Sequence, residues 1–116
     1  MNLFRKIAAR FTARGRALIL VDQGMACANN AQPDVAIKHY SDVINSSKSP
    51  CDVKAMALFN RALVYASIAR EQQATVDLKE ILKMPEAMAA IKKSANDKLV
   101  RMQRKLRREE SSKSDG

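Results

Sequence analysis

The residue types that most often carry out chemistry are scarce in this chain, and they are not assembled into a motif. His39 is the only histidine, and it stands beside Tyr40 in a segment of helical periodicity, where we expect it on the surface. The two cysteines, Cys27 and Cys51, lack the short spacing of a metal-binding pair. No glycine-rich loop could hold a phosphate, and no serine or cysteine stands in a nucleophile motif. The sequence therefore predicts a protein that is not an enzyme, with no metal and no cofactor.

Charge is the more informative feature, because it is concentrated at the two ends of the chain. Lysine and arginine number 21 against 12 aspartates and glutamates, which gives a formal net charge of +9. Residues 1–21 and residues 98–108 hold bases and no acid, whereas bases and acids are equal in number over residues 22–97. The second basic stretch supplies candidate phosphate contacts at Arg101, Arg104, Lys105, Arg107 and Arg108. Because no aromatic residue is interleaved with them for base stacking, a solvated helix end is the competing interpretation.

Residues 1–15 are predicted to form a basic amphipathic helix, with apolar residues on one side at Leu3, Phe4, Ile7, Ala8 and Phe11. This segment resembles an organelle import presequence, and it equally suits a helix lying on an anionic membrane surface. Docking on the neighbouring helices, with the arginines in water, is the alternative. The longest apolar run in the chain, Ala17 to Val21, is far shorter than the roughly 20 residues that a spanning helix needs. With two cysteines that we expect to be reduced, the protein is predicted to be cytoplasmic, unless residues 1–15 direct it to an organelle or a membrane surface.

The composition predicts a nearly all-helical chain. Hydrophobic residues make up 47% of it and aromatic residues only 4%, and just three glycines and three prolines interrupt it. Apolar periodicity and breaker residues place further helices at about 16–29, 33–45, 52–69, 71–83 and 86–108. Gly15 is the expected stop before the first of these, and Pro33 is expected in the first turn of the second. Residues 109–116 are rich in serine and are expected to be a disordered tail.

Two stretches of the chain superimpose when one is shifted by 38 positions. Ala36, Tyr40, Val43 and Ile44 return as Ala74, Leu78, Ile81 and Leu82, and Leu20, Gly24 and Cys27 return as Leu58, Ala62 and Tyr65. Similarity at a fixed period is the signature of stacked structural repeats. We therefore expect residues 16–85 to form two antiparallel helix pairs with Ala36 and Ala74 buried. Residues 86–108 are expected to be a long basic capping helix with a narrow apolar seam.

The repeated residues resemble the pattern of the tetratricopeptide repeat (TPR) family. That pattern is followed by Gly24, Cys27, Ala36, Tyr40, Val43 and Pro50 in the first unit and by Ala62, Tyr65, Ala74, Leu78, Ile81 and Pro85 in the second. The resemblance implies an all-α fold in which antiparallel helix pairs stack as a short α-solenoid. The usual TPR period is about 34 residues, so a longer loop is expected within residues 46–54. Two units are fewer than stacking normally requires, so flanking helices must act as caps or a second copy must supply the missing surface.

The same resemblance implies a concave groove lined by the first helix of each unit. The implied groove residues are Leu18, Val21, Asp22, Met25, Ala28, Asn29, Met56, Phe59, Asn60, Leu63 and Ser67. Met25, Met56 and Phe59 could receive an amphipathic helix or an extended peptide, since methionine adapts to varied partners. The alternative is that the chain's own last helix or a second copy covers this face. We expect Asn60 to hydrogen-bond to the backbone in the groove or between the units.

The leading hypothesis is a small TPR-like adaptor or scaffold that binds a peptide or helix of another protein in this apolar groove. The rival is a basic-armed module that attaches to nucleic acid or to an anionic membrane surface through its ends. Salt separates the two, because phosphate-driven binding weakens steeply with ionic strength and an apolar groove contact does not. A homodimer remains open under either hypothesis.

Overall fold

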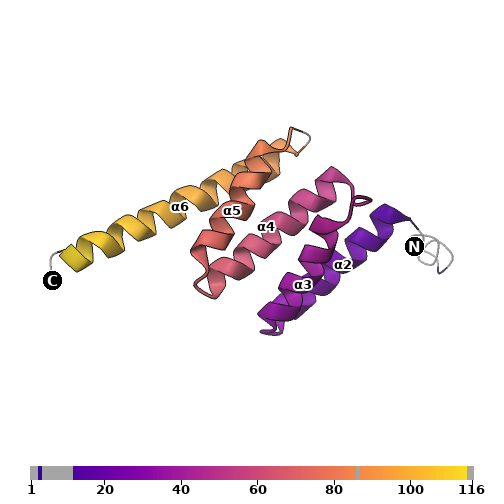
Figure 1. Ribbon diagram of the computed structural model, residues 1–116, viewed down its shortest axis with the longest axis horizontal. Coiled ribbons are helices and arrows are strands. Elements are labelled where there is room, and N and C mark those ends of the chain that lie inside the picture. Colours follow the sequence, from indigo (N-terminus) through magenta and orange to yellow (C-terminus); the bar gives the residue numbers. More distant parts are fainter. Residues whose placement is uncertain (1–2, 4–11, 86, 115–116) are drawn as a thin grey trace.

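The computed structural model describes Leu3, residues 12–85 and residues 87–114. All regular secondary structure in this part of the chain is α-helix (Figure 1). The helices in chain order are α2 (Ala13–Asn29), α3 (Pro33–Asn45), α4 (Cys51–Ser67), α5 (Glu71–Lys83) and α6 (Ala89–Ser114). No strand occurs among these residues, so the predicted all-α class is confirmed. The amphipathic helix expected over residues 1–15 lies mostly outside the described residues.

The helices stack in the order of the sequence, as Figure 1 shows. Each helix packs against the next one, and two further contacts join α2 to α4 and α4 to α6. The short turns within α2–α3 and α4–α5 make the two helices of each pair antiparallel. The stack is therefore built from pairs whose first helices lie next to one another, as expected for a helical repeat.

The last described helix, α6, follows the same 38-residue repeat as α2 and α4. The helices α2, α4 and α6 begin at Ala13, Cys51 and Ala89, each 38 residues after the one before. Since α6 contacts α4 as α4 contacts α2, it stands where the first helix of a third unit belongs. From the sequence, this segment was predicted to be only a cap.

Two hydrophobic clusters form the core of the stack. One joins α2, α3 and α4 and includes Val21, Ala36 and Tyr40. The other joins α4, α5 and α6 and includes Ala74, Leu78 and Leu99. Ala36 and Ala74 are both 0% exposed, which confirms the burial predicted from the repeat. Small side chains at these positions let the helix backbones approach closely.

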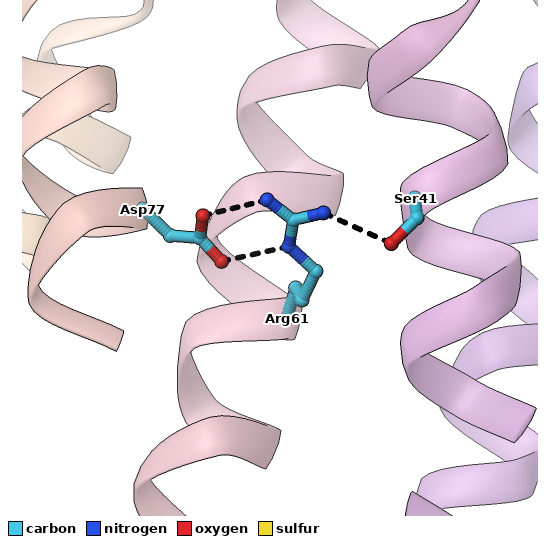
Figure 2. A network of polar contacts seen from close by, with 3 residues as sticks. All are labelled: Ser41, Arg61 and Asp77. Carbon is cyan, nitrogen blue, oxygen red and sulfur yellow. Dashed lines mark hydrogen bonds and ion pairs between the residues drawn. The ribbon is translucent and has the colours of Figure 1, made fainter. Parts of the chain in front are cut away.

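A partly buried polar network joins three helices in the middle of the stack (Figure 2). The guanidinium of Arg61, on α4, donates two hydrogen bonds to the carboxylate of Asp77, on α5, at 2.8 and 2.7 Å. It donates a third to the hydroxyl of Ser41, on α3, at 2.9 Å. These bonds to Asp77 raise the pKa of Arg61 above its ordinary value. The network joins the second helix of the first pair to both helices of the second pair.

The turns that close the two pairs are copies of one another. Ala31 and Ala69 have φ values of 58° and 61°, and the residue after each donates its N–H back to the carbonyl five residues earlier, as Gln32 does to Cys27 and Arg70 to Tyr65. This is the Schellman arrangement, in which a left-handed residue ends a helix. Glycine is the usual residue there, so alanine costs conformational energy in both turns.

Two expected helix ends differ from the structure. Gly15 does not stop a helix: α2 begins at Ala13, and the hydroxyl of Thr12 caps it by accepting a hydrogen bond from the N–H of Gly15 at 2.8 Å. At the other end of the chain, α6 continues past Arg108 to Ser114, through residues expected to be a disordered tail. Glutamates 109 and 110 favour helix, and no glycine or proline interrupts the chain between Ala87 and Gly116.

Candidate functional site

Side chains of the types that bind metal ions do not cluster in the described part of the chain. The described residues contain no group of three or more His, Cys, Asp or Glu residues that could hold a metal ion. His39 is half-buried on α3. None of the helices in this part of the chain combines the length and the apolar character needed to cross a membrane. The surface features that remain are pockets between helices and exposed basic residues.

The pocket that contains the predicted groove residues lies between α2 and α4, and Tyr40 of α3 also lines it. It has a volume of about 300 Å³ and is lined by Met25, Ala28, Asn29, Tyr40, Asn60, Leu63, Val64 and Ser67. Met25 and Leu63 are 44% and 38% exposed, which is high for large apolar side chains. The pocket thus presents apolar side chains that the stack itself does not cover, next to the polar side chains of Asn29, Asn60 and Ser67.

Polar groups in this pocket are held in place by short local hydrogen bonds. The amide of Asn60 donates to the carbonyl of Met56 at 2.8 Å, and the hydroxyl of Ser67 donates to the carbonyl of Val64 at 2.6 Å. The bond of Asn60 to the backbone agrees with the sequence prediction, and it uses the amide nitrogen of Asn60 rather than its amide oxygen. Burial, and more weakly the neighbouring Cys27, raise the pKa of the Tyr40 phenol.

The structure brings together half of the groove residues expected from the sequence. Those that line the pocket are Met25, Asn29, Asn60, Leu63 and Ser67, together with Ala28. Met56 and Asp22 are exposed on the same two helices but outside it.

The other three expected groove residues face the protein instead. Val21 is 1% exposed in the core between α2 and α3, so its assignment to the groove is wrong. Leu18 packs against the same cluster, and Phe59 packs against the cluster between α4, α5 and α6. The cause is geometric, because the apolar residues of α2 and α4 cover more than one helix face and the sequence does not show which face a neighbour takes.

A second pocket lies one unit further along the stack, where it overlaps the equivalent of the first pocket and of the neighbouring cavity lined by Ala28, Ala31, Pro33, Val64, Ser67 and Ile68. It lies between α4, α5 and α6, has a volume of about 90 Å³, and is lined by Ala66, Glu71, Lys98, Met102, Lys105, Leu106 and Glu109. Four of these residues are 38 positions after residues of the first pocket: Ala66 after Ala28, Lys98 after Asn60, Met102 after Val64, and Lys105 after Ser67. This pocket was not predicted from the sequence, although the 38-residue shift, extended into α6, indicates its position.

The candidate phosphate contacts are all on the surface of α6. Arg101, Arg104, Lys105, Arg107 and Arg108 are exposed. None of them is in an ion pair with a described residue, in contrast to Arg14, Lys38, Arg61 and Lys93, each of which pairs with an aspartate. These five charges therefore remain available to an anionic partner.

The amino-acid sequence and the structure were also compared with known proteins. No family model, no curated protein and no solved structure matches this chain. The TPR resemblance stays a prediction that depends on the residues quoted for it, and the helical repeat itself is what the structure shows.

Proposed function

We propose that this protein is a non-catalytic, TPR-like adaptor that binds a peptide or helix of another protein across α2 and α4. The observation that carries the proposal is the pocket between these helices, where Met25 and Leu63 stay exposed and Tyr40 forms part of the lining. A guest side chain inserted there would bury apolar surface on both partners, which stabilises the complex by about 25 cal/mol per Å².

Three further features support this role. The pocket lies between the first helices of two stacked pairs, which is the surface that helical repeats use for recognition. Methionine at position 25 can repack around guests of different shape. The amide oxygen of Asn60 can accept a hydrogen bond from a guest, since its amide nitrogen already donates to Met56.

The test uses the full chain and a displayed library of random peptides, because the natural partner is unidentified. Peptides enriched on the wild-type chain are synthesised, and their binding is measured by fluorescence anisotropy. We expect Leu63→Asp to weaken binding by at least about tenfold, because the charge would be desolvated in the complex. The matched control is Val76→Asp on α5, a side chain that is 66% exposed and lies outside the pocket, and it should bind as wild type does.

Two outcomes would contradict the adaptor. One is the absence of any enriched peptide, or enriched peptides that Leu63→Asp binds as well as wild type does. The other is a homodimer in sedimentation that Leu63→Asp converts to a monomer, which would make a second copy the occupant of the pocket. Circular dichroism of each variant separates loss of binding from loss of fold. Phe59→Asp is less suitable, because Phe59 packs against the core.

A further inference from the structure

We infer that the groove selects partners by charge polarity: the guest places its apolar anchor between α2 and α4 and its acidic residues against α6. This inference rests on the proposed function and adds the chemistry of the partner. It follows from comparing residues at equivalent positions on α2, α4 and α6, the three helices that lie next to one another in the stack.

Two positions are taken from the pockets themselves. Asn60 of the first pocket is replaced one unit later by Lys98 of the second, and Ser67 is replaced by Lys105. At both positions a neutral polar side chain on α4 becomes a cation on α6.

A third position gives the same trend over all three helices. Arg101 is exposed and lies three residues after Lys98 and four before Lys105, on the same side of α6. Its equivalents are Leu63 on α4 and Met25 on α2. The groove therefore changes along the stack from apolar side chains to a row of three cations.

The α2 end of the groove carries the opposite charge. Asp22, which is exposed on α2, takes the position equivalent to Asn60 and Lys98. A guest that lies across the three helices thus meets an acid, then neutral and apolar side chains, then bases. Charge complementarity fixes the direction in which such a guest binds.

Acidic residues near α6 do not cancel this row. Glu71 and Glu109 also line the second pocket, but neither is in an ion pair with Lys98, Arg101 or Lys105. Asp97 on α6 interacts with Arg101, but its carboxylate is already in an ion pair with Lys93. The three cations of the row therefore outnumber the two acids of the pocket, so an acidic guest is attracted and a basic guest is repelled at this end.

The test compares two synthetic peptides with the same leucine-rich anchor, followed by glutamates in one and by lysines in the other. We expect the wild-type chain to bind the glutamate peptide at least about tenfold more tightly at low salt, with the preference falling as salt is added. The double variant Arg101→Glu with Lys105→Glu should lose or reverse the preference. The matched control is the double variant Arg104→Glu with Arg107→Glu, which makes the same charge change about 110° around the helix axis. Its preference for the glutamate peptide should stay within about threefold of the wild-type preference.

Each outcome decides between the two proposals. If Leu63→Asp abolishes binding of the anchor but the two peptides bind equally, the charge inference fails and the adaptor stands. If Leu63→Asp has no effect, the adaptor itself fails. Equal weakening by both double variants, binding of neither peptide, or binding of a nucleic-acid duplex that both double variants weaken equally would overturn the inference, the last in favour of a phosphate-binding helix.

Discussion

The ring of Tyr40 occupies the space that a side chain at position 24 would need. A Cβ atom added to Gly24 would lie 2.5 Å from Cε1 of Tyr40, which is closer than carbon atoms approach in proteins. One unit later the equivalent residues are Ala62 and Leu78, both 0% exposed. The wide ring is thus matched with glycine and the narrower leucine with alanine, so the two units fill the same interhelical space in two ways.

This matching predicts that the effect of Gly24→Ala on stability changes sign with the residue at position 40. Gly24→Ala should destabilise the protein by about 1–3 kcal/mol, because Tyr40 is 1% exposed and has little room to move. In a Tyr40→Leu background the clash is absent, and the same substitution should stabilise by up to about 1 kcal/mol through helix propensity. Urea denaturation of the four proteins of this cycle measures both values. Destabilisation of equal size in both backgrounds would show that the Tyr40 ring is not the cause.

Substitutions of Arg61 and Asp77 should also have non-additive effects on the free energy of unfolding. Asp77→Leu alone leaves a partly buried guanidinium without its carboxylate and should cost about 3 kcal/mol or more. Adding Arg61→Leu should recover most of this loss, because well-packed apolar residues replace a buried ion pair at little cost. Leu99, the residue equivalent to Arg61 in the third unit, shows that leucine fits this place in the stack. Additive losses in the double variant would contradict this account.

The positive φ values of Ala31 and Ala69 predict that glycine at these positions stabilises the protein. Ala31→Gly and Ala69→Gly should each stabilise by about 0.5–1 kcal/mol, since glycine adopts a positive φ without steric cost. Ala26→Gly is the matched control: it is exposed inside α2 and should destabilise by about 1 kcal/mol. Thermal denaturation of the three variants checks the signs. A loss of stability in both turn variants would mean that the turns do not hold these φ values in solution.

The ion pair between Arg14 and Asp52 predicts a pH effect of known sign. It joins α2 to α4 at 2.9 Å between residues one repeat apart, and the hydrogen bond from Arg14 lowers the pKa of Asp52 on folding. The stability it supplies is present above the ordinary carboxyl pKa of about 4 and is lost as the pH falls through the lower folded value. The difference in unfolding midpoint between wild type and Asp52→Asn should therefore be constant near neutral pH and should disappear in acid.

Arg14 is exposed and Asp52 is only partly buried, so this difference in midpoint should be small and should shrink with salt. Asp52 also lies in the first turn of α4, where a carboxylate favours the helix on its own. Arg14→Gln separates the two contributions, because it removes the partner and keeps that carboxylate. A difference that persists at a pH well below the folded pKa would contradict the assignment.

Local signals in the sequence were sufficient for several elements. The predicted ranges 33–45 and 71–83 agree with α3 and α5, because Pro33 sets the start of the first and an acid stands in the first turn of each. The burial of Ala36 and Ala74 followed from the 38-residue shift alone. These features depend on residues close to one another in the chain or on one fixed period.

The candidate site was less predictable. Six of the eleven residues predicted for the groove line the first pocket, whereas Val21 is in the core and Phe59 packs against it. The second pocket, on α6, was missed, because only Ala57 and Val64, among the buried residues of α4, have buried equivalents in Ala95 and Met102. Elsewhere α6 carries polar residues, such as Lys93 where α4 has Ala55, since none of the described helices covers that side.

By itself, the sequence determined that the chain folds into repeated helix pairs, where most helices begin and end, and where charge accumulates. Periodic apolar residues and local stop signals carry that information, because they act over a few residues along one helix. Only the tertiary structure decided which helix face is buried, which is open, and which distant groups meet, as Arg61 meets Ser41 and Asp77. Those outcomes depend on how each helix is rotated against its neighbours, and packing of the whole stack sets that rotation.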